Sequence, residues 1–411
     1  MALSGSGLFT PGQSISNDEL VAKLRDFTSD ETTPEEAIRL FAAARERCPV
    51  AHSDKQGGFR LLLNYDDVKA AQSDWQVFAS SPSVTRPFAE RPPFPPLEQD
   101  PPEHTTWREL FTRVLNNDTA KEIEPLVRQD VVTLIEQLLQ RGSCDLVADF
   151  AEPLPLLALC HFLGFDVEKR DAIRAKALEM VGSLGDQERA AATFMALAQL
   201  GVEEVLARRS DPRDDFLTEL STAEIDGELL TAEQIAMAMS SFLVAGHGTT
   251  VAGLSSLLCE VLSSPEAKAR LSADPSLIPA AVEENLRLHP PFFALFRRVV
   301  KPTTIGDVEI AQDESVMLCW AAANRDPKVY DDPDMFSLDR KQSRRTRHLT
   351  FGFGIHACPG APIARMEMQV ALEELLARAP GVELEDPAAV AYEFRGTETA
   401  AIPSLPAIVH V

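Results

Sequence analysis

The sequence has 411 residues, of which 45% are hydrophobic and 25% are charged, an ordinary composition for a globular protein. Its 39 basic and 63 acidic residues give a formal net charge of −24 at pH 7. We therefore expect no binding to nucleic acid or to anionic membrane surfaces, which attract basic proteins. No apolar run approaches the roughly 20 residues of a transmembrane helix, and the N-terminus lacks a signal-peptide pattern. Six scattered cysteines without a CxxC pair favour free thiols in a reducing cytoplasm.

In chain order, the hydrophobic pattern predicts mostly helices with a few short strands. Thr33 and Glu36 form a capping box, with Pro34 at the first helical position. We expect an N-terminal extension at residues 1–33 and a single domain at 34–411. Further helices are predicted at 104–115, 118–141, 153–163, 168–184, 187–209, 231–263, 275–289 and 360–379, and strands near 59–63, 303–310, 315–319, 382–386 and 405–410. The expected fold class is mainly α with small peripheral β-sheets, because strands and helices do not alternate as in nucleotide-binding folds.

Residues 82–102 form an irregular segment with eight prolines together with Phe88, Phe94 and Leu97. A flexible surface linker would carry Ser, Gly and charge instead of phenylalanine. We expect an ordered lid over a pocket, with a plain linker as the alternative. Residues 326–350 form a second non-periodic segment.

Residues 351–365, FGFGIHACPGAPIAR, carry the most specific pattern. Glycines allow the backbone to approach a flat object closely, and Cys358 sits in a turn closed by Pro359 and Gly360. A predicted helix begins directly afterwards, so its N-terminal amides are expected to lower the pKa of the cysteine thiol. This indicates a thiolate that ligates a metal; a buried structural cysteine is the alternative.

This loop resembles the heme-binding loop of the cytochrome P450 family, the heme-thiolate monooxygenases, and the resemblance extends over roughly residues 35–411. It implies that Cys358 ligates the iron of heme b and assists catalysis as that ligand. It also implies that Phe351 packs near the sulfur, that Gly360 belongs to the heme-binding turn, and that His356 reaches a heme propionate. The implied fold is the single-domain cytochrome P450 fold.

Glu284 and Arg287 share one face of a predicted helix. Alone they would be a surface ion pair of little energetic value. They resemble the buried Glu-x-x-Arg pair of the family, and Arg340 resembles its third member. The resemblance implies a structural role in holding the cysteine loop.

The predicted helix 231–263 contains Ala245-Gly246-His247-Gly248-Thr249-Thr250. This segment resembles the family's oxygen-binding motif, in which Ala245 and Gly246 line a groove beside the heme and Thr249 assists protonation. Gly248 stands where the family usually has Asp or Glu, so the usual proton relay is in doubt. His247 is adjacent, but neighbours in a helix point about 100° apart. A Gly-His-Gly run also resembles, weakly, members that demethylate methoxyaromatic compounds.

Cationic side chains are expected to hold the heme propionates. His104 and Arg108 lie four residues apart on one helix face, as the family places such a pair. Arg297 matches the arginine that binds a heme propionate in the family. Arg298, one position later in the sequence, is the alternative.

We expect an external ferredoxin-type electron donor with its reductase, because no flavin or iron–sulfur domain follows in the sequence. Residues 341–348 include Lys341, Arg344, Arg345 and Arg347 without an acid. We expect this basic segment to dock the donor; a solvated cluster without a partner is the alternative.

The expected function is insertion of one oxygen atom from O₂ into a small apolar organic substrate, by hydroxylation or O-demethylation of an aromatic ether or terpenoid-like compound. A peroxide-dependent or non-hydroxylating enzyme of the same fold and a heme-binding sensor without turnover remain open. Apolar residues of this kind more often belong to the hydrophobic core than to a binding pocket. The candidate substrate-pocket residues are Phe88, Phe94, Leu97, Phe242, Leu243, Phe292, Phe293, Ala294, Leu295 and Phe394.

Overall fold

The structure, a computed structural model, describes residues 16–28, 31–86, 92–165, 187–225, 227–341, 343, 346–395 and 399–410. Its helices are α1 Asn17–Arg25, α2 Pro34–Arg47, α3 Tyr65–Ser73, α4 Glu103–Val114, α5 Asn117–Arg141, α6 Pro153–Leu163, α8 Gln187–Arg208, α9 Phe216–Ser221, α10 Ala232–Gly246, α11 Gly248–Leu262, α12 Pro265–Ala273, α13 Ile278–Leu288, α14 Trp320–Ala323 and α15 Ala361–Arg378. Shorter helical turns are η2 Lys55–Gly57, η3 Val147–Ala151, η4 Pro275–Leu277, η5 Gly354–His356 and η6 Pro387–Ala389.

The strands are β1 Val50–Ser53, β2 Phe59–Leu62, β3 Phe78–Ala79, β4 Ser143–Asp145, β5 Glu224–Ile225, β6 Glu228–Leu229, β7 Leu295–Val299, β8 Thr303–Ile305, β9 Val308–Ile310, β10 Ser315–Leu318, β11 Gly381–Leu384, β12 Glu393–Arg395, β13 Thr399–Ala401 and β14 Pro406–His410. The largest sheet has the order β1-β2-β10-β7-β3, and only its β2–β10 pair is parallel within the described residues. A second sheet has the order β11-β14-β4, and the other strands form two-stranded pairs.

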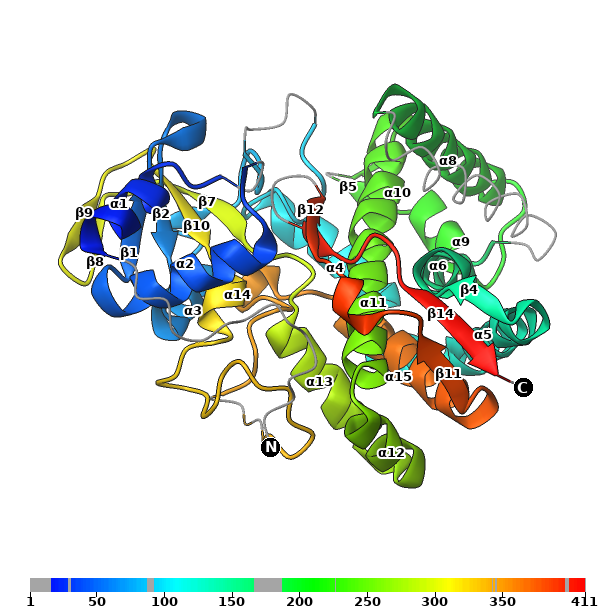
Figure 1. Ribbon diagram of the computed structural model, residues 1–411. Helices are drawn as coiled ribbons and strands as arrows, with labels where there is room; N and C mark the ends of the chain where they lie inside the picture. The colour runs from blue at the N-terminus through cyan, green and yellow to red at the C-terminus, as the bar shows by residue number, and fades with distance from the viewer. Residues whose placement is uncertain are drawn as a thin grey trace.

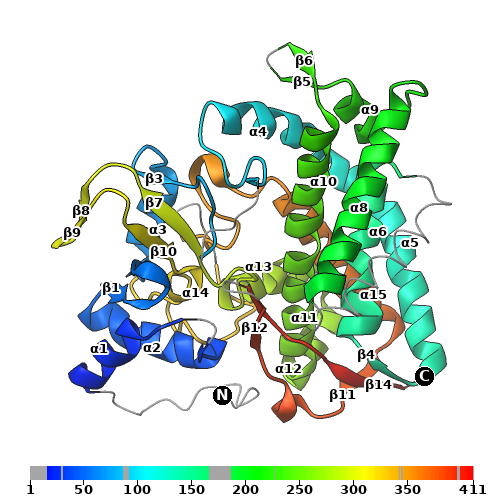
Figure 2. The same ribbon diagram turned by 90° about the horizontal axis from the view of Figure 1, so that it is seen from above.

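Figures 1 and 2 show two regions: a smaller one in which α1, α2 and α3 lie around the five-stranded sheet, and a larger, mainly helical one. In the smaller region, Leu20 and Leu24 of α1 pack in one hydrophobic cluster with Phe41 of α2 and Phe59 of β2. The part of segment 1–33 that forms α1 is thus joined to the same core as the residues that follow it.

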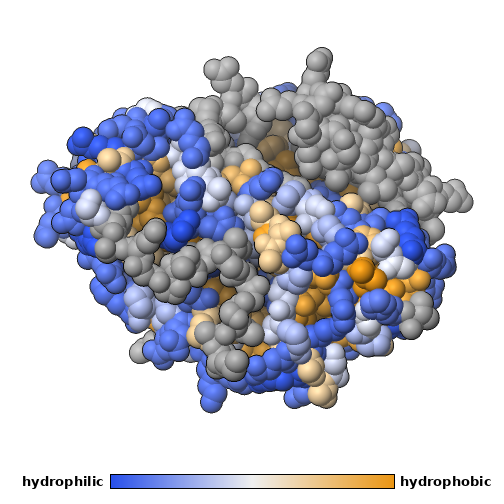
Figure 3. All heavy atoms as spheres, in the orientation of Figure 1, coloured by the Kyte–Doolittle hydropathy of each residue, from blue (hydrophilic) through white to orange (hydrophobic). Residues whose placement is uncertain are grey.

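The helical region is built on the apolar face of α5. Val127, Val131, Leu134 and Leu138 recur at three- and four-residue spacing and are almost completely buried. They belong to a core cluster with residues of α6, α11, α13 and α15. The face of the molecule in Figure 3 is mostly hydrophilic, with hydrophobic residues showing between the polar ones, as expected for so acidic a chain.

The predicted helix 231–263 is divided in two, which corrects the expectation of one continuous helix. Helix α10 ends at Gly246, α11 begins at Gly248, and His247 between them has φ −88° and ψ −74°. The hydroxyl of Thr249 donates a hydrogen bond to the carbonyl oxygen of Ala245 (2.6 Å) at this break. Glycine on both sides of His247 makes the helix easier to interrupt here. Contrary to the expectation from the sequence, the run Ala232–Leu262 is long and apolar enough to cross a membrane, but 72% of its apolar window is buried inside the structure.

The prediction of a mainly α fold with small sheets is confirmed. The predicted capping box at Thr33 is present, and a second capping box at Thr231 begins α10. The sequence did not indicate β7, whose residues are buried except for half-buried Arg298 and therefore lack polar–apolar alternation. The predicted helix 168–184 lies outside the described residues.

Candidate functional site

A cavity lies between the α10–α11 break and the cysteine loop, residues 351–360. Residues of α4, α6, α10, α11 and α15, of the segment 94–97 and of the cysteine loop all line it, so a group bound there would be enclosed by much of the helical region. We call the two opposing sides the loop wall, formed by the cysteine loop, and the helix wall, formed by residues 241–250. Predicted site residues that line the cavity are Phe94, Leu97, Arg108, Phe242, Ala245, Gly246, Thr249, Phe292, Leu295, Arg297, Phe351, His356, Cys358 and Gly360.

The loop wall has a backbone that only glycine can follow. Gly352 and Gly354 have φ values of +70° and +71°, in the left-handed region. A Cβ added at Gly354 would lie 2.7 Å from the carbonyl oxygen of Gln72, so this turn packs directly against the end of α3. The amide of Cys358 donates a hydrogen bond to the carbonyl oxygen of Phe351 (2.7 Å), which closes the loop.

Cys358 lies deep inside the protein, yet its side chain is exposed to the cavity. Burial raises the pKa of the Cys358 thiol, while the backbone amides of Gly360 and Ala361 and the nearby Arg108 lower it. The amides thus act in the predicted direction, but desolvation outweighs them and the net pKa is raised instead of lowered. A buried thiolate of this kind needs a further positive charge, which a metal cation supplies.

Arg365 braces the cysteine loop from outside the cavity. Its guanidinium carbon lies 4.4 Å from the centroid of the Phe351 ring, and Arg365 donates two hydrogen bonds to Glu283 (2.6 and 2.9 Å). His348 Nε2 lies 3.2 Å from the same carboxylate. These partners outweigh desolvation and lower the pKa of Glu283 to about 2. The sequence analysis missed Glu283, which directly precedes the Glu of the Glu-x-x-Arg pattern.

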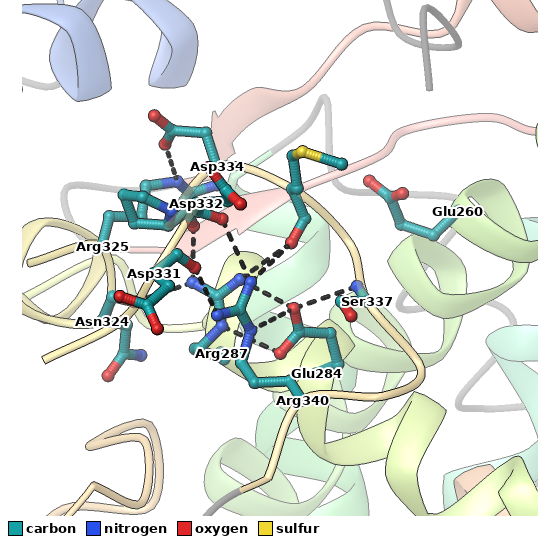
Figure 4. Close-up of polar contacts among 12 residues, drawn as sticks. Glu260, Glu284, Arg287, Asn324, Arg325, Asp331, Asp332, Asp334, Ser337 and Arg340 are labelled. Carbon is teal, nitrogen blue, oxygen red and sulfur yellow. Dashed lines mark hydrogen bonds and ion pairs between the residues drawn. The ribbon is translucent and has the colours of Figure 1, made fainter. Parts of the chain in front are cut away.

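A second brace is the predicted ion-pair cluster of Glu284, Arg287 and Arg340 (Figure 4). Arg287 donates two hydrogen bonds to Glu284 (2.8 and 2.9 Å), and Arg340 Nε donates a third to the same carboxylate (2.8 Å). Arg287 is fully buried and also donates to the carbonyl oxygens of Asn324, Pro333 and Met335. The cluster therefore ties α13 to the long segment that leads into the cysteine loop.

Cationic and imidazole groups gather at one side of the cavity. Arg108 and Arg297 line it, whereas Arg298 points away and pairs with Asp313 (2.9 Å), so the register favours Arg297. Burial lowers the pKa of Arg297 to about 10. His104 does not line the cavity but packs behind His356, with ring centroids 4.5 Å apart. Burial lowers the pKa of His104 to about 4, so its ring is neutral at pH 7.

The residues present fit a heme. Nε2 of His356, which lines the cavity, is buried without a hydrogen bond among the described residues, and its carboxylate neighbour Asp100 lies 3.7 Å away. A propionate carboxylate would supply a hydrogen-bond acceptor there, beside Arg297. Cys358 is the single cysteine among the described residues that line the cavity. No group of three His, Cys, Asp or Glu side chains in the described ranges could hold a bare metal ion. A single thiolate in a cavity that also contains Arg108, Arg297 and His356 matches a heme iron better than a zinc site, which needs three or four protein ligands.

The helix wall is interrupted by the break between α10 and α11. Thr249 lines the cavity with its hydroxyl bound to Ala245, whereas Gly248 is not among the lining residues. A Cβ added at Gly248 would meet no atom within 4 Å. His247 is buried on the opposite side, with Nε2 3.2 Å from Oε2 of Glu152 and 3.1 Å from its carbonyl oxygen.

Part of the predicted substrate pocket is corrected. Leu243, Phe293, Ala294 and Phe394 are absent from the cavity wall. Leu243 points about 100° away from Phe242 along the helix and packs in a neighbouring core cluster. Phe293 packs against Phe41 and Phe394, with ring centroids 5.7 and 5.1 Å away, on the far side of the β7 end. Phe88 lies outside the described residues, as do Arg344 and Arg345 of the predicted docking segment.

The sequence analysis missed several lining residues, including Phe111, Phe162, Leu159, Pro95, Pro96 and Glu367. Phe111 and Phe242 stack with ring centroids 4.4 Å apart. Phe111 belongs to the helix of His104 and Arg108, three residues after Arg108, so its helical position was the available signal. The lid segment is held by buried Glu98, which accepts hydrogen bonds from the amide of Phe94 (2.8 Å) and the hydroxyl of Ser83 (2.9 Å).

The fold and cavity thus define a heme-thiolate protein, and comparisons with known proteins place it further. A family model described as "Cytochrome P450" matches residues 180–379. Cytochrome P450 107B1 of Saccharopolyspora erythraea is 34% identical over 339 residues, covering 79% of this chain and 82% of that protein. Erythromycin C-12 hydroxylase of the same organism is 34% identical over 364 residues, covering 85% of this chain and 88% of the other. The solved structure of CYP109Q5 from Chondromyces apiculatus matches with a TM-score of 0.80 and 30% identity, covering 95% and 98% of the two chains.

The chain belongs to the cytochrome P450 family, which confirms the predicted family. It is a monooxygenase of the bacterial type, and members of this family bind heme b through a cysteine thiolate.

Proposed function

We propose that this enzyme inserts one oxygen atom from O₂ into a small apolar compound, either an aromatic ether or a terpenoid-like molecule, with Cys358 as the heme ligand. When bound, the heme supplies the activation of O₂. The single observation that carries the proposal concerns the cavity. The thiol of Cys358 lies deep inside the protein but is exposed to this cavity, whose wall is made mostly of aromatic and aliphatic side chains.

The residues have distinct tasks in this proposal. The braced cysteine loop holds Cys358 at a fixed place, and Arg108, Arg297 and His356 hold the propionates through charge and hydrogen bonding. Thr249 keeps a hydroxyl at the break in the helix wall, where it orients proton donors. The surrounding apolar side chains exclude bulk water from the reacting centre.

The substrate class is inferred from the lining. Phe94, Phe111, Phe162, Phe242 and Phe292 all contribute to the cavity wall. The hydroxyl of Ser241, a polar group on the helix wall, already donates to the carbonyl oxygen of Met237 (3.0 Å). Substrate orientation therefore rests mainly on shape and on ring contacts, which favours apolar and aromatic compounds.

A spectroscopic binding panel tests the substrate class. Neutral methoxyarenes and monoterpenes should displace iron-bound water and shift the Soret band, and a methoxyarene should bind more tightly than its carboxylate analogue. Phe292→Ala should weaken binding about fivefold, because a lost aromatic contact is worth roughly 1 kcal/mol. The control Phe394→Ala removes a ring of the same kind outside the cavity and should leave affinity unchanged. Tighter binding of a macrolide than of every small compound would overturn the proposed class.

We also propose a ferredoxin-type donor that docks beside the cysteine loop. Lys69 and Arg347 both lie over the Phe353 ring of that loop, with Nζ and Cζ 5.1 and 4.6 Å from its centroid. Two cations at the loop surface of a chain with net charge −24 form a local site for an acidic partner. In the part of the chain that the structure describes, the one helical run long enough to span a membrane is mostly buried, which supports the proposed cytoplasmic location, where such donors occur.

Charge reversal tests the donor site. Lys69→Glu with Arg347→Glu should reduce ferredoxin-driven turnover and flatten its dependence on salt, because exposed charge pairs are screened. Turnover driven by peroxide should be retained, and Arg39→Glu on α2, which contributes no cavity residue, should retain both activities. Equal loss of both activities would contradict docking at this surface. Peroxide-driven turnover faster than donor-driven turnover in the unmodified enzyme would favour the peroxide-dependent alternative.

A further inference from the structure

His247 is a buried histidine at the break in the helix wall, and the reaction described above does not use it. Only 6% of the residue is exposed, and it is not among the described residues that line the cavity. Its backbone, with φ −88° and ψ −74°, separates α10 from α11. A polar side chain is rarely buried this fully without a hydrogen bond or a task, so the imidazole requires an explanation.

The hydrogen-bond partner of His247 is Glu152, which is 2% exposed. Nε2 of His247 lies 3.1 Å from the carbonyl oxygen of Glu152 and 3.2 Å from its Oε2. A carbonyl oxygen can only accept a hydrogen bond, so Nε2 carries the hydrogen and donates it toward this pair of oxygens. We call this contact the His247 clamp. It uses both the backbone and the side chain of Glu152, so it restrains the imidazole more than a single hydrogen bond would.

Glu152 is a well-fixed anchor for the clamp because of its place in the chain. It joins the turn η3 to α6, and its amide donates a hydrogen bond to the carbonyl oxygen of Val147 (2.9 Å). Pro153, whose φ is fixed by its ring, is the first residue of α6. The same helix lies against the break further along, since a Cβ added at Gly246 would lie 3.8 Å from Cδ1 of Leu159. The clamp therefore ties the break to a helix that already packs beside it.

Thr249 lies on the opposite side of the turn formed by residues 245–249. Successive residues of a helix point about 100° apart, so His247 and Thr249 point roughly 200° apart. The Thr249 hydroxyl lines the cavity and donates to the carbonyl oxygen of Ala245 (2.6 Å), a type of bond that often bends a helix. The turn is thus held by His247 at its back and by Thr249 at the cavity.

The two glycines beside His247 give this turn little stiffness of its own. Gly246 and Gly248 have more conformational freedom than any other residue type would have at these positions. A Cβ added at Gly248 would meet no atom within 4 Å, so side-chain packing does not fix the turn at position 248. The hydrogen bond to Glu152 therefore supplies a restraint that the glycines lack.

We propose that His247 is a positioning residue that acts through Thr249. By clamping the back of the turn to Glu152, it holds the Thr249 hydroxyl at one place on the cavity wall, where that hydroxyl orients proton donors. His247 takes no part in proton transfer, because neither it nor Glu152 is among the described residues that line the cavity. This inference deepens the proposed function and rests on it: without the clamp the hydroxyl moves, and electrons leave as peroxide instead of reaching product.

The first test requires no turnover. The infrared C–O stretching band of the reduced carbon monoxide complex reports the polar surroundings of a small ligand in the cavity. It should be narrow in the unmodified enzyme and broadened or split in His247→Phe, which keeps a ring but removes the hydrogen bond. His161→Phe is the matched control, because His161 of α6 is also buried and paired, with Nε2 2.6 Å from Oδ2 of Asp130. An unchanged band in His247→Phe would overturn the proposal, even if the enzyme turns over normally.

The second test measures coupling, the product formed per reduced nicotinamide consumed. His247→Phe should release about tenfold more peroxide per product, the effect expected when an ordered proton-delivery group is lost. His247→Gln, whose amide can still donate, should recover part of the coupling. In a Thr249→Ala background, His247→Phe should cause no further loss, because residues that act as one unit are not additive. Additive losses would show that His247 does not act through Thr249 and would overturn the proposal.

A variant of Glu152 tests the clamp from its other side, and it decides the question if His247→Phe does not fold. Glu152→Leu removes the carboxylate but keeps the carbonyl acceptor, so peroxide release per product should rise by a smaller factor, about threefold. The C–O band should broaden as well. An unchanged band and unchanged coupling in Glu152→Leu would overturn a clamp that depends on the carboxylate.

The outcomes separate this inference from the proposed function. Each variant is compared only if its reduced carbon monoxide complex shows the same Soret band as the unmodified enzyme, which reports an intact heme site. Failure of the unmodified enzyme to form product from O₂ would overturn the proposed function, and the C–O band would still test the clamp. Normal coupling in His247→Phe would overturn the clamp and leave the monooxygenase reaction intact.

Discussion

The two walls of the cavity differ in how firmly their polar groups are held. In the loop wall, the turn at Gly354 packs against backbone atoms of α3, and Glu283 and Glu284 brace the approach to the loop. In the helix wall, the main helix is interrupted at His247 and a side chain at position 248 would meet no neighbour.

This difference matches two chemical needs. A metal ligand must stay in one place, so the structure around Cys358 is fixed by many bonds at once. Protons, O₂ and substrate must move, so the opposite wall needs space and a group that releases a hydrogen bond easily. If this account is right, substitutions in the loop wall change stability and heme loading, and substitutions in the helix wall change coupling.

The largest stability effect is expected for Arg287→Met. This change leaves the Glu284 carboxylate buried with only part of its partners, and breaking a buried ion pair costs about 3–5 kcal/mol. Urea unfolding of the holoenzyme and the fraction that retains heme measure it. The control Arg270→Ala breaks an exposed ion pair with Asp339 and should leave the unfolding midpoint unchanged. Equal effects of the two changes would contradict the bracing role.

A smaller loss is expected for Gly354→Ala. Alanine at φ +71° is strained by about 1–2 kcal/mol, and its Cβ would also lie 2.7 Å from the carbonyl oxygen of Gln72. Gly306→Ala is the matched control, since Gly306 has φ +58° and open space around its Cβ position. Each substitution lowers the free energy of unfolding, and the difference between the two losses measures the cost of the close contact with α3. No difference would show that α3 does not constrain the cysteine loop.

In the helix wall, Thr249→Ala should affect coupling far more than stability. The change removes the hydroxyl that donates to Ala245, and we expect about a tenfold increase in peroxide released per product formed. Thr249→Ser keeps a hydroxyl and should retain most of the coupling. A well-coupled Thr249→Ala enzyme would show that proton delivery does not pass this residue.

The smallest effect concerns acid stability. Because the folded-state pKa of Glu283 is lowered to about 2 from its ordinary 4.5, ionised Glu283 stabilises the fold above pH 4.5. That contribution is lost as pH falls from 4.5 toward 2. Glu283→Gln should therefore be less stable than the unmodified enzyme at neutral pH, and the difference should shrink in unfolding experiments at lower pH. A difference that is constant with pH would contradict the ionised pairing with Arg365 and His348.

Sequence analysis predicted the loop wall better than the helix wall for a physical reason. Glycine, cysteine and proline in a fixed order meet steric demands that few other sequences satisfy, so the cysteine loop could be located from residues 351–360 alone. Glu283 and Glu367 carry no such local signal, because their burial follows from how α13 and α15 pack. The break at His247 was missed because a helical pattern of apolar residues continues on both sides of it.

Residues 292–295 of the predicted substrate pocket show the same limit of prediction from sequence. Phe292 and Leu295 reach the cavity, while Phe293 and Ala294 turn into the core beneath the sheet. All four are apolar, so hydrophobicity alone could not separate them. Their orientation depends on how the chain enters β7, where Leu295 pairs with Leu318 of β10 and Phe292 forms a bridge to Thr399 of β13, and both pairings are tertiary properties.

The central claim is that Cys358 supplies the thiolate that holds the heme. Its most direct test is the absorption spectrum of the reduced carbon monoxide complex of the purified enzyme, compared with that of Cys358→Ser. The account predicts the red-shifted Soret band of a thiolate-ligated heme in the unmodified enzyme and its loss in Cys358→Ser. A folded, heme-loaded enzyme that lacks this band, or a Cys358→Ser variant that retains it, would contradict the account.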